Sequence, residues 1–145
     1  VVTDPDPAPV SFISAYDSKC LDIRGGSVAD GAIAQQWGCG GWGNQKFEIW
    51  PVSGSPGRFM LVAQHSYKCL DTQGFLSLVR QWACASPSVP QQRFAISSNG
   101  GNAYNLRSEQ NLGWAVDIYG PNASDGTQLV YLPMSNGWSQ RWWIA

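Results

Sequence analysis

The 145-residue chain contains one pattern of residues three times over. Each copy has an Asp in a short apolar run and, after a nearly constant interval, a Gln-x-Phe or Gln-x-Trp segment. The three glutamines are Gln45, Gln92 and Gln140, and the two intervals between them differ by a single position. Landmarks that recur in one order and with one period rarely arise by chance. The chain is therefore predicted to consist of three copies of one structural unit.

Within each copy the apolar residues follow a pattern typical of strands. The middle residue of each Gln-x-Phe or Gln-x-Trp segment is a cation, namely Lys46, Arg93 or Arg141. Because side chains alternate between the two faces of a strand, this cation is predicted to lie in water and both its neighbours to point inward. Gly- and Pro-rich stretches at 53–57 and 97–101 predict turns. No segment has a sustained helical period, and short strands at regular spacing predict an all-β barrel or sandwich.

The composition argues against two classes of partner. Charged residues make up 13% of the chain and the net charge is -1, so no basic surface is expected that would attract a nucleic-acid backbone. No apolar run approaches the roughly 20 residues that a membrane span requires. Residues 1–9 contain three prolines and are predicted to form an extended, linker-like segment. They lack the basic start and apolar centre of a signal peptide.

The four cysteines fall into two pairs at matching positions of the first two copies. Cys20 and Cys39 form the first pair, and Cys69 and Cys84 form the second. A zinc site would favour closer Cys-x-x-Cys spacing. Disulfides within each copy are the favoured interpretation, with free thiols as the alternative. Each bridge would stabilise the fold by roughly 3 kcal/mol, and disulfides predict an oxidising compartment, hence secretion.

The order Cys-Leu-Asp, then Gln-x-Trp-x-Cys, then Asn-Gln-x-Phe or Trp, resembles the ricin B-type lectins and family 13 carbohydrate-binding modules. The resemblance covers residues 10–145. It implies a single β-trefoil domain, with three four-stranded repeats at about 10–56, 57–101 and 102–145 around a pseudo-threefold axis. The repeats would share one aromatic core, so none should fold alone.

A sugar ring offers vicinal hydroxyls and an apolar C–H face, so a site for it needs a carboxylate, amides and an aromatic ring. The first repeat holds such a set at the positions that the resemblance implies. Asp22 would accept hydrogen bonds from two hydroxyls, Trp37 would stack on the ring, and Asn44 would donate to a hydroxyl. Gln35 would contribute at the rim. Gln45 would orient Asp22 rather than dominate binding.

Structural roles for the same residues remain open at this point. Asp22 could cap a turn through its own backbone, and Trp37 could belong to the core. Trp42 and Trp138 lie just before Gln-x-Phe or Gln-x-Trp segments. If exposed, they would extend the aromatic platforms; otherwise they would pack the open end of a barrel.

The second repeat keeps Asp71, Trp82, Gln91 and Gln92 as candidate site residues. It lacks the Asp-Gly turn that the other two repeats have at 30–31 and 125–126, and its Cys-to-Cys loop is shorter by four positions. The shorter loop is expected to tilt the platform of its own repeat. Arg80 stands where the first repeat has Gln, and would either pair with Asp71 and fill the site or contact an acidic sugar.

The third repeat keeps Asp117 but aligns Leu132 with the aromatic platform and Ser139 with the Asn. Tyr131 is one residue early and could stack only if its strand slips or bulges. A structural role is favoured for this repeat, so one or two working sites are expected rather than three.

The predicted function is a non-catalytic lectin or carbohydrate-binding module. Its partners would be galactose-type or related sugars on a glycoprotein, glycolipid or polysaccharide, without a cofactor or metal. Weak single sites would require an oligomer, several sites or attachment to a larger protein. The alternatives are a protein-binding trefoil, such as an inhibitor or a toxin's receptor-docking subunit, and the targeting module of a larger secreted enzyme or toxin. The sequence contains no convincing catalytic carboxylate pair, phosphate loop or metal-ligand spacing.

Overall fold

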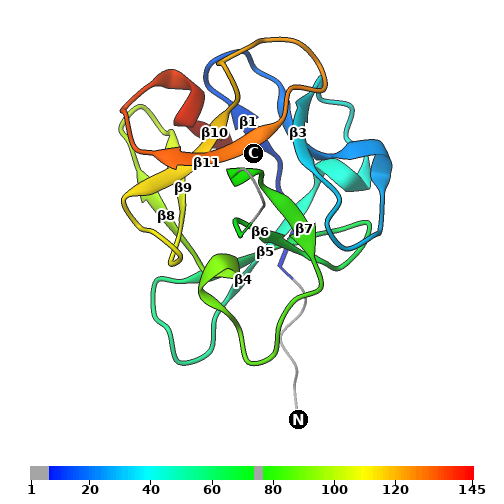
Figure 1. Cartoon of the computed structure of the whole chain (residues 1–145), viewed down its shortest axis with the longest axis vertical. Coiled ribbons are helices and arrows are strands. Elements are labelled where there is room, and N and C mark those ends of the chain that lie inside the picture. The colour runs from blue at the N-terminus through cyan, green and yellow to red at the C-terminus, as the bar shows by residue number, and fades with distance from the viewer. Residues whose placement is uncertain (1–6, 74–76) are drawn as a thin grey trace.

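The computed structural model describes residues 7–73 and 77–145, and all of their regular structure is β-strand or short 3-10 turn (Figure 1). The strands are β1 (Phe12–Ser14), β2 (Cys20–Ile23), β3 (Ala34–Trp37), β4 (Phe47–Pro51), β5 (Phe59–Ala63), β6 (Cys69–Asp71), β7 (Arg80–Trp82), β8 (Phe94–Ser98), β9 (Tyr104–Ser108), β10 (Trp114–Ile118), β11 (Leu129–Pro133) and β12 (Trp142–Ile144). The 3-10 turns are η1 (Arg24–Gly26), η2 (Gly43–Gln45), η4 (Pro90–Gln92) and η5 (Trp138–Gln140). None of these elements is a helix long and apolar enough to cross a membrane. Residues 1–6 of the predicted linker-like segment lie outside the described part of the chain.

Six strands form a closed barrel. Antiparallel pairing runs from β1 through β12, β9, β8 and β5 to β4. A bridge between Val10 and Phe47 then joins β4 back to the segment before β1. The closed barrel leaves none of these six strands as a free edge.

The other six strands form three hairpins, β2–β3, β6–β7 and β10–β11. Isolated bridges connect the hairpins in a ring: Ile33 to Arg80, Leu78 to Val130, and Gln128 to Gln35. Figure 1 shows the three units around a common centre. This arrangement of a six-stranded barrel and three linked hairpins is a β-trefoil, as the repeat predicts.

One core is shared by all three repeats. Phe47, Phe94 and Trp142, which end the three Gln-x-Phe or Gln-x-Trp segments, are fully buried and belong to one cluster. The cations beside them are only partly buried. The predicted alternation is therefore confirmed in each repeat, and because the core residues come from all three, the repeats stabilise one another.

Both predicted disulfides are present, Cys20–Cys39 and Cys69–Cys84. Each joins the first strand of a hairpin to the segment just after the Trp of the second strand, and in the β2–β3 register Cys20 lies opposite Trp37. The third repeat has Ala115 and Met134 at the two positions, so its hairpin is held without a covalent link.

Candidate functional site

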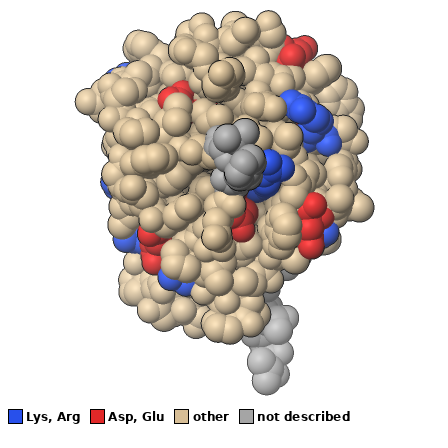
Figure 2. All heavy atoms as spheres, viewed as in Figure 1, with Lys and Arg blue, Asp and Glu red and all other residues tan. Residues whose placement is uncertain are grey.

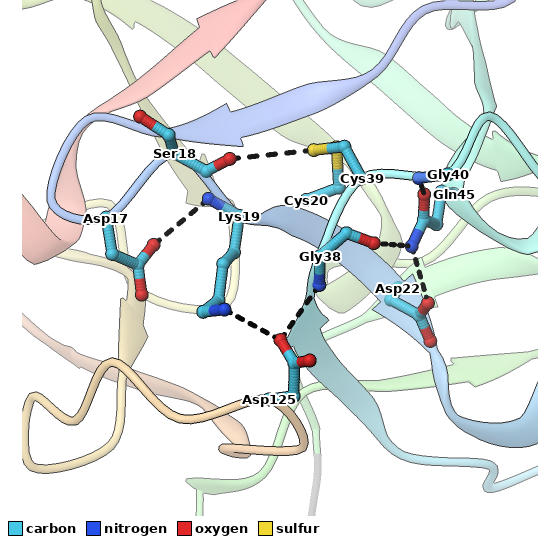
Figure 3. The surroundings of a disulfide bond; sticks show 10 residues. All are labelled: Asp17, Ser18, Lys19, Cys20, Asp22, Gly38, Cys39, Gly40, Gln45 and Asp125. Carbon is cyan, nitrogen blue, oxygen red and sulfur yellow. Dashed lines mark hydrogen bonds and ion pairs between the residues drawn. A yellow bond between two sulfur atoms is a disulfide. The ribbon is translucent and has the colours of Figure 1, made fainter.

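The same buried network of hydrogen bonds occurs in all three repeats. In the first, Gln45 Nε2 donates to Asp22 Oδ2 at 2.9 Å and to the Gly38 carbonyl at 3.0 Å. Its Oε1 accepts from the Gly40 N–H at 2.8 Å. Gln45 thus ties the loop after β3 to the aspartate on β2, and Figure 3 shows the glutamine between the two.

The other two glutamines repeat these contacts. Gln92 Nε2 donates to Asp71 Oδ2 and Gln140 Nε2 to Asp117 Oδ2, both at 3.1 Å. All three glutamines are buried and use both ends of the amide within the protein. A glutamine in this position orients the carboxylate and has no amide hydrogen left to donate to a ligand. This agrees with the orienting role expected of Gln45.

The first repeat forms a cavity of about 640 Å³ that contains four of its five predicted site residues. Asp22, Gln35, Trp37 and Asn44 line it, whereas Gln45 lies beneath. Trp37 is 41% exposed, so the alternative that it belongs to the core is wrong. Trp42 is 56% exposed and lines the same cavity, so it extends the aromatic wall rather than packing the barrel.

Asp22 is held by two amides and keeps acceptor capacity for a ligand. Gln35 Nε2 donates to its Oδ1 at 3.1 Å, and Gln45 takes one lone pair of Oδ2. An ionised carboxylate has about four acceptor positions, so the hydrogen bonds from Gln35 and Gln45 do not use all of them. Burial raises the pKa of Asp22 above its ordinary value, and the hydrogen bonds from Gln45 and Gln35 offset this only in part. Asn44 Nδ2 donates to the Ile23 carbonyl at 3.0 Å, which fixes that amide at the cavity wall.

Arg24 is a cavity residue that the sequence interpretation missed. It begins η1 directly after β2, and its Nε donates to Gln35 Oε1 at 2.8 Å. The guanidinium therefore fixes the orientation of Gln35, whose other end contacts Asp22. The available signal was a cation two residues after the aspartate and directly before Gly25 and Gly26.

The second repeat forms a smaller cavity, of about 320 Å³, lined by Asp71, Trp82, Gln91 and Gln92 among others. Trp82 is 47% exposed. Asp71 Oδ1 accepts from the backbone N–H of Gln73 at 2.8 Å, so this carboxylate also closes a local turn. All four predicted residues of this repeat are thus brought together.

Arg80 does not fill the second cavity. It lies opposite Asp71 in the β6–β7 register, but its Nη1 donates at 3.0 Å to the carbonyl of Gly31, in the first repeat. The described residues form no ion pair between Arg80 and Asp71. The alternative in which Arg80 pairs with Asp71 and fills the site is therefore wrong, because a backbone acceptor from the neighbouring repeat takes the guanidinium.

The third repeat has the network without a platform. Asp117 is buried and accepts from Gln140 and from the N–H of Ile118. The β10–β11 pairs run in unbroken register, so no bulge turns Tyr131 outward. Its ring is buried, and its hydroxyl donates to the Asn111 carbonyl at 2.6 Å and accepts from the backbone N–H of Ser108 at 2.7 Å. Leu132 remains at the platform position.

The chemistry of the two cavities is that of recognition through hydrogen bonds and stacking. Each combines a buried carboxylate, side-chain amides and an exposed indole. Within residues 7–73 and 77–145, no group of three His, Cys, Asp or Glu side chains could hold a metal ion.

The six-stranded barrel and the three hairpins define the class of β-trefoil proteins. The chain matches the family model of the ricin-type beta-trefoil lectin domain over residues 8–142. It therefore belongs to the ricin-type β-trefoil lectin family. No curated protein matches it in sequence.

Solved structures support the same fold. A designed 3-fold symmetric protein, ThreeFoil, is 26% identical with a TM-score of 0.86, over 94% of this chain and 97% of the other. The C-half of an earthworm R-type lectin in complex with GalNAc is 17% identical with a TM-score of 0.76, over 97% and 98%. An exo-β-1,3-galactanase from Clostridium thermocellum is 21% identical with a TM-score of 0.87, over 99% of this chain and 31% of that one. The chain thus spans about a third of the galactanase.

Proposed function

We propose that this chain is a non-catalytic sugar-binding domain, with a principal site in the first repeat and a secondary site in the second. The observation that carries the proposal is the first cavity, which is lined by Asp22 together with two exposed indoles, Trp37 and Trp42. Residues 10–145 would act as one domain, and the disulfides favour an extracellular location.

In this proposal each residue has a distinct part. The free acceptor positions of Asp22 take two neighbouring hydroxyls, and such charge-assisted bonds are stronger than neutral ones. Trp37 stacks on the apolar face of the sugar, and Trp42 adds a second indole to the lining of the cavity. Asn44 fixes the orientation of the ring at the cavity wall, whereas Gln35 is buried rather than at the rim and holds Asp22 in place. The second site uses Asp71, Trp82 and Gln91 in a smaller space.

Galactose-type sugars are the proposed class. The support is family membership and the earthworm lectin, whose structure contains GalNAc. The face drawn in Figure 2 carries positive and negative side chains close to one another rather than in separate patches. Such a surface suits a neutral sugar on a glycoconjugate or polysaccharide better than a highly charged polymer.

The deciding experiment is a titration of the ¹⁵N-labelled protein with galactose, lactose and GalNAc, with mannose and xylose for comparison. The indole N–H signals of Trp37 and Trp82 report the two sites separately. Saturable shifts of the Trp37 signal, strongest with galactose-type sugars, are expected. If no sugar shifts either signal at millimolar concentration, the chain is not a lectin, and a protein partner becomes the better hypothesis.

Replacing Trp37 by Ala should weaken sugar binding at the first site by roughly 5- to 30-fold, because a stacking contact contributes about 1–2 kcal/mol. Isothermal titration calorimetry would measure the loss. Trp82→Ala is the matched control, since it removes the same side chain from the second cavity and should leave the stronger binding event intact.

Sugar binding at the first site should weaken on acidification at a pH above 3.8, the ordinary pKa of an aspartate. Burial raises the pKa of Asp22, so the carboxylate that accepts the hydroxyls is protonated earlier than usual. The contribution of Asp22 to the free energy of unfolding changes in the opposite direction. Because the pKa of Asp22 is higher in the folded than in the unfolded protein, this contribution is fully present below the unfolded pKa. It is lost as the pH rises through the folded pKa.

Affinity and melting temperature measured at the same series of pH values would check this. On acidification the affinity should fall, whereas the contribution of Asp22 to the melting temperature should rise. Affinity that stays constant down to the ordinary aspartate range would contradict the role of Asp22.

The galactanase favours one second candidate, a targeting module. This chain resembles about a third of an exo-β-1,3-galactanase. The mass of the native product would decide whether the domain occurs alone or attached to a larger protein.

A further inference from the structure

The wall of the first cavity is held by a turn from the third repeat. Asp125 Oδ1 accepts from the backbone N–H of Gly38 at 2.9 Å and pairs with Lys19 Nζ at 2.8 Å. The next residue, Gly126, accepts from Arg24 Nη2 at 3.0 Å through its carbonyl. Figure 3 shows Asp125 between Lys19 and Gly38, beside the Cys20–Cys39 disulfide. Gly38 directly follows Trp37, so the turn fixes the backbone at the platform.

Close packing accompanies these hydrogen bonds. Gly126 has φ +88°, a conformation that favours glycine, and a Cβ there would lie 3.7 Å from Cζ3 of Trp37. The turn therefore lies against the indole as well as against the chain that carries it.

The same arrangement connects the first repeat to the second site. Asp30 Oδ1 accepts from the N–H of Ala83 at 2.9 Å and pairs with Lys68 Nζ at 3.0 Å. Gly31, with φ +86°, accepts from Arg80, and a Cβ at this position would lie 3.1 Å from Cζ3 of Trp82. The contacts of Asp125 with Gly38 and Lys19 recur as those of Asp30 with Ala83 and Lys68. This recurrence argues against a chance arrangement of surface side chains.

The third repeat lacks the residues that would contact such a turn, and no turn is available to contact it. The second repeat, which would supply it, has no Asp-Gly turn. Pro133 occupies the position of Gly38 and Ala83, and proline has no N–H to donate. Trp114 occupies the position of the two lysines. The third repeat, which no such turn contacts, is also the repeat without an aromatic platform.

We propose that each sugar site is assembled across two repeats, with Asp125 and Asp30 as positioning residues for Trp37 and Trp82. The proposal rests on the proposed function. Each aspartate holds the N–H that follows the tryptophan, and so fixes the indole at the correct distance from the carboxylate of Asp22 or Asp71. A mutation in the third repeat should therefore change binding in the first, and one in the first repeat should change binding in the second.

The test compares Asp125→Ala with Asp30→Ala in the full chain, using site-resolved sugar titrations on the indole signals of Trp37 and Trp82. Asp125→Ala should weaken the first site by about five- to tenfold and leave the second unchanged. Asp30→Ala should do the reverse. The two variants lose equivalent contacts, so each is the matched control of the other, and a general loss of stability would not produce opposite patterns.

Asp125→Asn and Lys19→Met separate the two contacts of the aspartate. Asn still accepts from Gly38, and partly exposed ion pairs contribute little, so both variants should keep most of the affinity. They also remain informative if Asp125→Ala fails to fold, because a loss in Lys19→Met equal to that expected of Asp125→Ala would contradict positioning through Gly38.

Variants that affect both sites equally, or neither, would overturn the proposal. The indole signals of the sugar-free protein provide a readout that does not depend on the function. Asp125→Ala should shift Trp37 and not Trp82. If no sugar binds the unmodified protein but these selective shifts occur, the proposed function fails while the positioning contact stands.

Discussion

The protein in which Asn replaces Asp22 is expected to bind sugar at the first site about 10- to 100-fold more weakly. The substitution keeps the shape of the side chain but removes the charge that strengthens two hydrogen bonds to hydroxyls. The substitution also replaces one acceptor oxygen by an amide N–H₂ donor. In the unmodified protein both oxygens accept, one from Gln35 and one from Gln45, so the new donor would face another donor. Calorimetric titration with the preferred sugar would measure the change.

The third repeat supplies the control for this substitution. Asp117→Asn disturbs the same buried network, because Gln140 donates to Asp117 as Gln45 does to Asp22. Both variants should therefore lose similar thermal stability, but only Asp22→Asn should lose sugar binding. If Asp117→Asn proves more damaging to binding, the ranking of the three repeats is wrong.

Removal of the Cys20–Cys39 disulfide, by changing both residues to Ala, should lower the melting temperature by roughly 6–12 °C. The bridge joins residues with a sequence separation of 19, for which loop entropy gives about 3 kcal/mol. For a domain of this size each kcal/mol corresponds to about 2–4 °C. Because Cys20 lies opposite Trp37 in the β2–β3 register, sugar affinity at the first site should also fall.

The second disulfide is the comparison. Its sequence separation of 15 predicts a similar stability loss when Cys69 and Cys84 are changed, with the effect on binding confined to the second site. Scanning calorimetry of both variants and of the reduced protein would measure the losses. An unchanged melting temperature after complete reduction would show that the bridges add nothing to stability.

The fold could be predicted from the sequence because its evidence is periodic. The fully buried aromatic residues, such as Phe47 and Trp142, recur at one spacing, and the cation before each of them marks the outward face. Site residues at positions shared between repeats could be grouped for the same reason, and Asp22 and Trp37 do line one cavity. Arg24 lies in the same repeat but has no counterpart in the other two, and was missed.

Contacts between repeats could not be predicted in this way. Comparison of repeats aligns equivalent positions, and says nothing about which positions of different repeats are neighbours. Gly38 and Asp125 lie far apart in the sequence, as do Ala83 and Asp30, yet each pair is joined by a hydrogen bond. From the sequence, the shorter loop of the second repeat is expected to tilt the platform of that same repeat. In the structure, the turn at Asp125 contacts the first repeat and the turn at Asp30 contacts the second. The hydrogen bond from Arg80 to Gly31, in the first repeat, could not be predicted for the same reason.

Closure of the barrel has a consequence for how fast the protein reaches its native state. Phe12 pairs with Ile144, so the last strand must find the first across almost the whole chain. Each disulfide shortens the connecting chain only by its own loop, with sequence separations of 19 and 15, so most of the chain still separates the two strands. Proteins dominated by such distant pairings fold in about milliseconds to seconds, far more slowly than helical bundles. The folding rate should therefore depend on the encounter of the two chain ends, and only weakly on the disulfides that stabilise the folded form.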